Sequence, residues 1–197
     1  MNLSGIHYWV FDMDGTLTMA VHDFPAIKRA LDIPQDHDIL GHLAQLPADV
    51  AAAKHAWLLE HERELALASQ AAPGAVELVR DLAARGYRLG ILTRNARELA
   101  HVTLQAIGLA DCFALDDILG RDEAAHKPDP AGLLHLAQAW QVEPSQMVMV
   151  GDYRFDLDCG RAAGTRTILV NVPENPWPEL TDWHAQDCNE LRALLGH

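Results

Sequence analysis

Cysteine and long apolar runs are both scarce in this sequence of 197 residues. Cys112, Cys159 and Cys188 form no CxxC pair and leave one thiol over, so they indicate neither a disulfide framework nor a zinc knuckle. No apolar run approaches the roughly 18 residues that crossing a bilayer requires, and the N-terminus lacks a basic segment followed by a long apolar one. We therefore expect a cytoplasmic protein with no membrane partner.

Basic residues are also few. The sequence has 15 Lys and Arg residues and 28 Asp and Glu residues, which gives a formal net charge of −13. A nucleic-acid surface needs clustered cations to neutralise the phosphate backbone, so we expect no nucleic-acid partner. The same net charge repels an anionic small molecule. A phosphate ligand would therefore need a bound metal ion and a few well-placed basic side chains.

Four short apolar segments have the length and the unbroken hydrophobicity of strands that are buried on both faces. Helical patterns separate the later ones, and Pro73, Gly86 and Pro130 mark helix starts or ends. Alternation of this kind predicts an α/β fold with a doubly wound, parallel-sheet (Rossmann-like) core. The predicted strands begin near Ile6, Tyr87, Gln146 and Thr165, and the predicted helices cover 73–85, 96–107, 130–140, 155–163 and 188–195.

Residues 19–72 show helical patterns and no strand. The helical stretches are 24–31, 36–46 and a long one that opens at Pro47, whose Trp57 face we expect to lie in the interior of this segment. The segment is too long for a simple crossover. We therefore predict a small all-helical subdomain of residues 19–72, inserted after the first strand, and a core of residues 1–18 and 73–197.

Polar side chains follow the predicted strands at their carboxyl ends, where doubly wound sheets bind ligands. Mg²⁺ prefers hard oxygen ligands, and Asp12 and Asp152 are suited to bind it. Asp14 follows Asp12 by two residues and precedes a turn at Gly15, so one aspartate can attack a phosphoryl group while the other moves protons. A hydroxyl and an ammonium group suit the phosphoryl oxygens. The candidate side chains are Asp12, Asp14, Thr93, Arg94, Asn95, Lys127, Asp152 and Asp156.

The segments "FDMDGTL", "ILTRN", "HKPDP" and "GDYRFDLDCGRAAG", in this order and with a helical insert after the first, closely resemble the four motifs of the haloacid dehalogenase-like hydrolase superfamily. The resemblance is to its phosphoglycolate phosphatase-like phosphatases, which carry a small helical cap. It implies that Asp12 is the nucleophile and forms an aspartyl-phosphate, and that Asp14 protonates the leaving oxygen and then activates water. It also implies that Thr93 and Lys127 hold the phosphoryl group, where Arg94 and Asn95 are further candidates.

The resemblance implies a Mg²⁺ site as well. Asp12, the carbonyl of Asp14 and Asp152 would hold the ion, with Asp156 behind them. Dehalogenases of the superfamily lack an aspartate at the position of Asp14, and phosphonatases have alanine there. The predicted activity is therefore Mg²⁺-dependent hydrolysis of a small phosphate monoester by a monomer or homodimer. The alternatives are a phosphomutase of the same family and a non-hydrolytic phospho-acceptor or binding protein.

The Asp12 and Asp14 pair has three other interpretations. A calcium loop would place glycine at its sixth position, whereas Gly15 is the fourth residue from Asp12. A signalling receiver would need adjacent acids after the first strand and an acceptor aspartate on a later strand before Thr93, and the sequence has neither. Asp and Gly favour a strand-end turn without any chemistry, but such a turn does not account for the three partner motifs.

The sequence departs from the family pattern in two places. "TMAVHDF" replaces the usual Asp-Ser pair after the first motif, and Tyr153 stands where the fourth motif usually has Ser. His22, Asp23 and Phe24 lie where the chain passes from the first motif into the insert. We therefore expect these three residues to contribute to substrate specificity.

Overall fold

Parallel strands form one sheet of six in the computed structural model, which describes residues 3–20 and 24–196 apart from the side chains of Ser4, Phe24 and Leu40. The strand order is β3-β2-β1-β4-β5-β6, so β1 lies between β2 and β4. In sheets of this order, ligands bind at the carboxyl ends of the strands where the winding reverses, which here is beside β1. The strands are β1 (Tyr8–Phe11), β2 (Arg88–Leu92), β3 (Ile118–Leu119), β4 (Met147–Gly151), β5 (Arg166–Leu169) and β6 (Trp183–His184).

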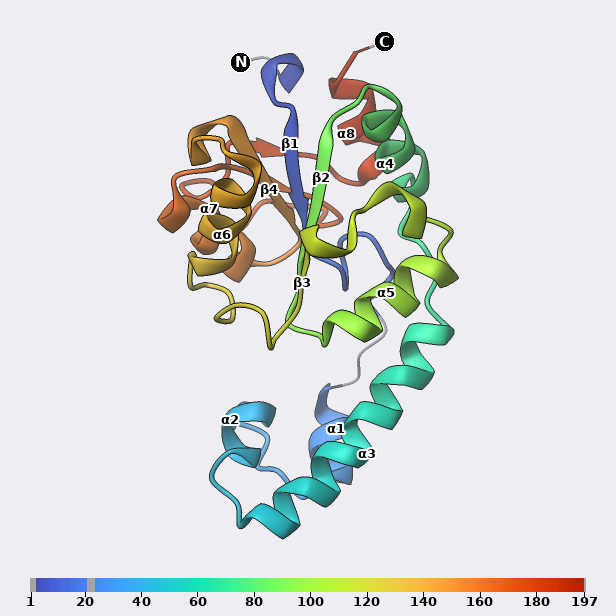
Figure 1. Cartoon of the computed structure of the whole chain (residues 1–197), viewed down its shortest axis with the longest axis vertical. Coiled ribbons are helices and arrows are strands. Elements are labelled where there is room, and N and C mark those ends of the chain that lie inside the picture. The colour runs from blue at the N-terminus through green and yellow to red at the C-terminus, as the bar shows by residue number, and fades with distance from the viewer. Residues whose placement is uncertain (1–2, 21–23, 197) are drawn as a thin grey trace.

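Helices cover both faces of the sheet (Figure 1). Side chains alternate along β1, so that Trp9 and Phe11 pack with α4, α5 and α8 on one face while Val10 packs with α6 and α7 on the other. All three side chains are fully buried, which explains why this strand reads as a continuous apolar run. The helices of the two layers are α4 (Ala75–Ala84), α5 (Arg97–Ala106), α6 (Ala131–Trp140), α7 (Arg154–Ala163) and α8 (Cys188–Leu194).

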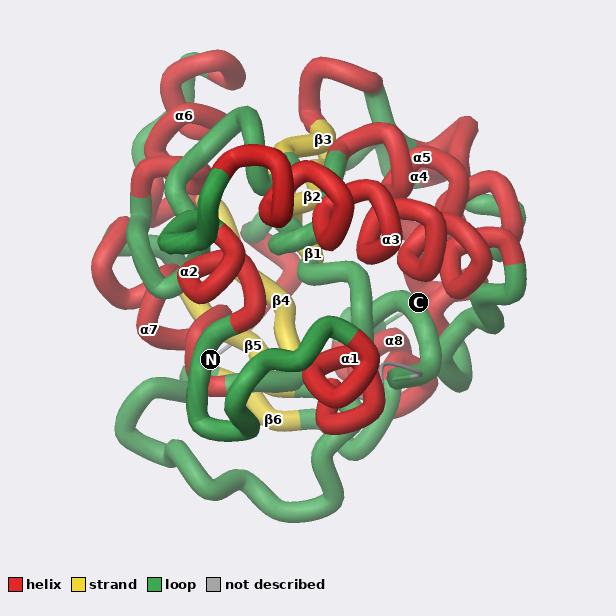
Figure 2. The backbone as a smooth tube through the Cα atoms, turned by 90° about the horizontal axis from the view of Figure 1, so that it is seen from below, coloured by secondary structure: helices red, strands yellow, loops and turns green. Residues whose placement is uncertain are grey.

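Three further helices, which we call the cap helices, lie between β1 and β2 in the chain: α1 (Phe24–Ala30), α2 (Ile39–Leu43) and α3 (Ala48–Leu67). They lie beyond the carboxyl ends of the strands (Figures 1 and 2). None of the helices in the described part of the chain combines the length and the apolarity that crossing a bilayer requires. The cap helices have an apolar cluster of their own, which contains Ile27, Leu31, Ile33, Leu43 and Leu58.

The chain enters and leaves the cap helices through two segments that lie side by side. The amide of Met19 donates to the carbonyl of Gln70, and the amide of Ala72 donates to the carbonyl of Leu17, both at 2.9 Å. Thr18 and Ala71 form the antiparallel bridge between these segments. The inserted segment therefore begins and ends at neighbouring points of the core.

The predicted doubly wound core is confirmed, and its four predicted strands are β1, β2, β4 and β5. Strands β3 and β6 were not predicted, because two residues are too few to show a period. The expectation for Trp57 is wrong: its side chain is 41% exposed and stacks on His61, with ring centroids 5.1 Å apart. The next residue, Leu58, occupies the inward position, because successive residues of a helix point about 100° apart.

A buried carboxylate joins the start of β2, the segment before β3 and the end of α6. Asp117 accepts a hydrogen bond from the indole Nε1 of Trp140 at 2.7 Å and two from the guanidinium of Arg88 at 3.0 and 3.3 Å. Replacing Asp117 with Ala leaves the buried indole N–H without its acceptor, so we expect the free energy of unfolding to fall by about 2 to 3 kcal/mol. Urea denaturation measures this. The matched control is Asp116→Ala, which removes an exposed carboxylate next to it.

Candidate active site

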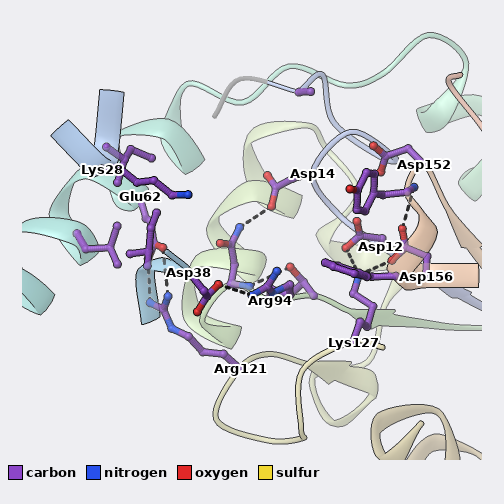
Figure 3. Close-up of a pocket in the computed structure, with 18 residues that line it drawn as sticks. Asp12, Asp14, Lys28, Asp38, Glu62, Arg94, Arg121, Lys127, Asp152 and Asp156 are labelled. Atoms are coloured by element: carbon purple, nitrogen blue, oxygen red, sulfur yellow. Dashed lines mark hydrogen bonds and ion pairs between the residues drawn. The ribbon is translucent and has the colours of Figure 1, made fainter. Parts of the chain in front are cut away.

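Side chains from three strand ends and from the cap helices line one cavity of about 680 Å³ (Figure 3). Asp12 follows β1, Thr93 follows β2 and Asp152 follows β4. These strands are neighbours in the sheet, and their parallel direction brings their carboxyl ends to the same edge. The cavity therefore lies at the edge that the sequence predicts. Its lining also includes Asp14, Arg94, Asn95, Lys127 and Asp156.

The turn after β1 positions Asp152. The amides of Thr16, Leu17 and Thr18 all point to the carbonyl of Met13, which closes a tight turn. Within this turn Gly15 has φ +85°, and a Cβ added there would lie 2.4 Å from Oδ2 of Asp152. Only glycine fits both the conformation and the close approach. Thr16 completes the contact by donating its hydroxyl to Oδ1 of Asp152 at 2.9 Å.

Three carboxylates and one ammonium group form the centre of the cavity. One ligand oxygen each from Asp12, Asp152 and Asp156 lies within 4.8 Å of the others. The side chain of Lys127 is 3% exposed, and its Nζ lies 2.5 Å from Asp12 and 2.7 Å from Asp156. Burial lowers the pKa of Lys127, but the two carboxylates outweigh burial and hold this pKa above its ordinary value. Lys127 therefore remains charged and is fixed against both acids.

Negative charge exceeds positive charge in this cluster. Burial, together with the charge of Asp12, raises the pKa of Asp152 to about 6, and burial raises the pKa of Asp156 against the opposing charge of Lys127. Carboxylate oxygens at this spacing are the donor set that a hard divalent cation prefers. The residues present therefore fit a divalent metal ion. The resemblance implied that Asp156 lies behind the residues that hold the metal ion. In the structure, a carboxylate oxygen of Asp156 belongs to the same cluster of three potential ligand oxygens as those of Asp12 and Asp152.

Asp14 has a different environment from Asp12. Burial, together with the nearby charge of Asp12, raises the pKa of Asp14 to about 7 against the opposing effects of Lys127 and Asn95. The side-chain amide of Asn95 donates to Oδ2 of Asp14 at 2.6 Å. The backbone amide of Asn95 in turn donates to the hydroxyl of the buried Thr93 at 3.1 Å. The segment after β2 therefore orients the carboxyl group of Asp14.

Two ion pairs across the cavity join the cap helices to the core (Figure 3). Arg121 donates two hydrogen bonds, of 3.1 and 2.8 Å, to the carboxylate of Glu62 on α3. Arg94 donates to Asp38, which precedes α2, at 3.1 Å. The sequence gave no indication of Arg121, Glu62 or Asp38, because their partners are 56 to 59 residues away in the chain and the segments carry no motif.

The remaining candidates from the sequence divide into two groups. Thr93, Arg94 and Asn95 all line the cavity, although the guanidinium of Arg94 is bound to Asp38. His22 and Asp23 lie outside the described residues. Phe24 is the first residue of α1, and its side chain is not described.

Residues 8–164 match the family model of the haloacid dehalogenase-like hydrolases. The chain belongs to this family. The family that the sequence indicates is therefore confirmed, and so is its fold. Family members generally use a divalent metal, in agreement with the acidic cluster.

Relatives of known name support the prediction of a phosphoric monoester hydrolase. The phosphoglycolate phosphatase of Rhodospirillum rubrum is 33% identical in an alignment 193 positions long, which covers 82% of this chain and 78% of that protein. The N-acetylmuramic acid 6-phosphate phosphatase of Pseudomonas putida is 30% identical in an alignment 182 positions long, which covers 82% of this chain and 81% of that protein. A hydrolase structure from Pseudomonas syringae superimposes with a TM-score of 0.76 at 25% identity and covers 96% of this chain and 97% of its own.

Proposed function

We propose that this protein is a Mg²⁺-dependent phosphatase that hydrolyses a small-molecule phosphate monoester through an aspartyl-phosphate on Asp12. One observation carries the proposal: the carboxylates that follow β1 and β4 and the ammonium of Lys127 line a single cavity at the switch point of the sheet. Phosphoryl transfer needs little covalent chemistry from a protein beyond a nucleophile, charge stabilisation and a proton donor. Asp12, Lys127 and Asp14, which line this cavity, are our candidates for these three roles.

In the first step, an oxygen of the Asp12 carboxylate attacks phosphorus and the bond from phosphorus to the ester oxygen breaks. The leaving oxygen takes a proton from the carboxyl group of Asp14. A pKa of about 7 leaves a substantial share of Asp14 protonated near neutral pH, which suits a general acid. Asn95 holds this carboxyl group in place through its 2.6 Å hydrogen bond.

In the second step, water replaces the leaving alcohol. The Asp14 carboxylate takes a proton from this water, whose oxygen then attacks phosphorus, and the bond from phosphorus to Asp12 breaks. Inorganic phosphate and a free Asp12 carboxylate result, while the proton on Asp14 serves the next first step. The same group therefore acts as acid and then as base, as microscopic reversibility requires.

Negative charge on the phosphoryl group must be balanced throughout both steps. Lys127 presents a fixed ammonium beside the attacking oxygen of Asp12, and the hydroxyl of Thr93 is a further donor in the cavity lining. Arg94 and Asn95 are proposed as additional phosphate ligands. Asp12, the carbonyl of Asp14 and Asp152 would hold Mg²⁺, with Asp156 beside them. When bound, the ion would supply the positive charge that lets two anions approach each other.

A panel of phosphate monoesters tests this function. We expect the purified protein with Mg²⁺ to release inorganic phosphate from at least one member of a set that includes phosphoglycolate, sugar phosphates and nucleotides. Excess chelator should lower the rate on the order of a hundredfold or more, because it removes the charge that screens Asp12 from the phosphate, and added Mg²⁺ should restore it. The proposal fails if no ester releases phosphate, or if the chelated protein keeps its full rate.

A further inference from the structure

Exposed aromatic side chains stand at the edge of the cavity. Among the described residues, the aromatic side chains that are large and exposed are Trp57, Tyr153 and Phe155, and the last two line the cavity at 53% and 38% exposure. Exposed apolar surface that gathers at one place commonly marks a binding site. Trp57 does not line this cavity. The exposed aromatic side chains of Tyr153 and Phe155 therefore indicate a ligand-binding surface at the edge of the cavity.

The two rings form a fixed surface. Tyr153 and Phe155 meet edge to face, with centroids 5.2 Å apart and planes at 86°. The ring of Tyr153 also meets that of Trp177 edge to face at 5.4 Å. The backbone amide of Tyr153 donates to Oδ2 of Asp156 at 3.1 Å, and the amide of Asp156 donates back to the carbonyl of Tyr153. The hydrogen bonds fix the backbone that carries Tyr153, and the edge-to-face contacts pack its ring against those of Phe155 and Trp177.

The two aromatic residues are sequence neighbours of two acids of the proposed metal site, and all four line the same cavity. Tyr153 directly follows Asp152, and Phe155 directly precedes Asp156. Asp12 lines this cavity too, so a phosphate ester held at Asp12 would have its leaving group in the cavity that the two rings line. Across the cavity, the cap helices contribute apolar side chains to the lining, namely Ile27, Ile39 and Leu58.

Charge in the half of the cavity next to the cap helices is largely matched. Arg121 pairs with Glu62 and Arg94 pairs with Asp38, so both guanidinium groups already have a carboxylate partner. Lys28 donates to a backbone carbonyl at 2.8 Å. A leaving group with its own carboxylate would have to compete with Glu62 and Asp38 for these cations, whereas an uncharged leaving group would not.

The size of the cavity favours a bulky leaving group. The volume is about 680 Å³ while the cap helices are joined to the core by both ion pairs. Pockets of roughly 300 to 1,000 Å³ hold ligands of drug size, so a leaving group of two carbon atoms would fill little of this one. The unfilled volume would contain water next to the exposed rings, which an apolar group would displace favourably.

We propose, on the basis of the function proposed above, that the preferred substrates are phosphate monoesters of alcohols that carry an uncharged planar ring. The ring packs on Tyr153 and Phe155 while the phosphoryl group lies at Asp12. Tyr153 and Phe155 thus determine which substrates are preferred. Both residues belong to the segment that resembles the fourth motif, and neither belongs to the cap helices.

Two primary alkyl esters isolate the contribution of the ring, since their leaving groups are chemically alike. We expect kcat/KM for 2-phenylethyl phosphate to exceed that for ethyl phosphate and for phosphoglycolate by about tenfold or more, the order of magnitude of one good aromatic contact. Tyr153→Ala and Phe155→Ala should each lower the ratio of phenylethyl to ethyl phosphate by about threefold to tenfold. Using the ratio cancels any general loss of activity in a variant. Tyr153→Phe keeps the ring and should keep the ratio within about twofold.

Leu134→Ala is the matched control, because it removes an exposed apolar side chain of α6 outside the cavity lining and should leave the ratio unchanged. Equal kcat/KM for the phenylethyl and ethyl esters would overturn the inference, and so would an unaltered ratio in both alanine variants. A hexose 6-phosphate that is hydrolysed faster than the phenylethyl ester would also overturn it. If no ester in the set releases phosphate, the proposed function fails and the inference fails with it. Release without any preference for the ring overturns the inference alone.

Discussion

Replacing Asp12 with Asn should lower kcat by about 10⁴-fold or more, the largest effect of any single substitution in this chain. The amide nearly matches the carboxylate in size, so the cavity keeps its shape, but the amide oxygen carries no negative charge with which to attack phosphorus. The substitution also removes one partner of Lys127 and one of the three clustered carboxylates. Steady-state phosphate release measures the loss, with the best ester of the panel as substrate.

A covalent label separates this role from a merely electrostatic one. Wild-type protein that is quenched in acid during turnover of a ³²P-labelled ester should carry label on the chain, and Asp12→Asn should carry none. Asp111→Asn is the control, because Asp111 is an exposed aspartate that does not line the cavity. An Asp12→Asn protein that kept more than a few per cent of the wild-type rate would rule out Asp12 as the nucleophile.

Lys127→Met should impair both stability and activity. The ammonium of Lys127 is buried between Asp12 and Asp156, and its removal leaves two carboxylates without their cation. Breaking a buried pair in this way costs about 3 to 5 kcal/mol of unfolding free energy in the metal-free protein. We also expect kcat to fall by roughly 10² to 10³, because a fixed positive charge beside the phosphoryl group is lost.

Lys54→Met provides the comparison for Lys127. Lys54 lies on α3, where its ammonium is 3.8 Å from the exposed carboxylate of Asp32 and donates to the carbonyl of Leu31. Loss of this exposed ion pair should change the unfolding free energy by no more than about 1 kcal/mol. Chemical denaturation in the presence of chelator measures both variants. Equal stability of Lys127→Met and the wild type would show that the buried ion pairs do not stabilise the fold.

The fold and the acidic centre were predictable because each depends on a local pattern. Strand β1 is an apolar run that ends directly at Asp12, and β4 ends just before Asp152. The rule that ligands bind at the carboxyl ends of parallel strands then brings these two aspartates together without any knowledge of coordinates. No strand ends directly before Lys127, and only its place within the ordered motifs indicated it.

The contacts that were missed depend on long-range packing. The pairing of Glu62 with Arg121 links α3 to the segment after β3, and neither residue has a neighbour in the sequence that would suggest the other. Asp117 is similar, because a buried carboxylate beside an indole cannot be told from a surface aspartate until Trp140 is placed. Trp57 shows the opposite error, since a helical period does not fix which of two adjacent apolar residues points inward.

The paired segments at Leu17–Met19 and Gln70–Ala72 have a consequence for how such enzymes diversify. Because the inserted segment starts and finishes at neighbouring points, a change in its length need not move the strands of the sheet. Doubling the length of a flexible insert adds only about 0.6 kcal/mol of closure entropy. Helices of another length could therefore replace the cap helices while Asp12 and Asp152 stay in place at the strand ends, provided that the new helices again supply carboxylate partners for Arg94 and Arg121.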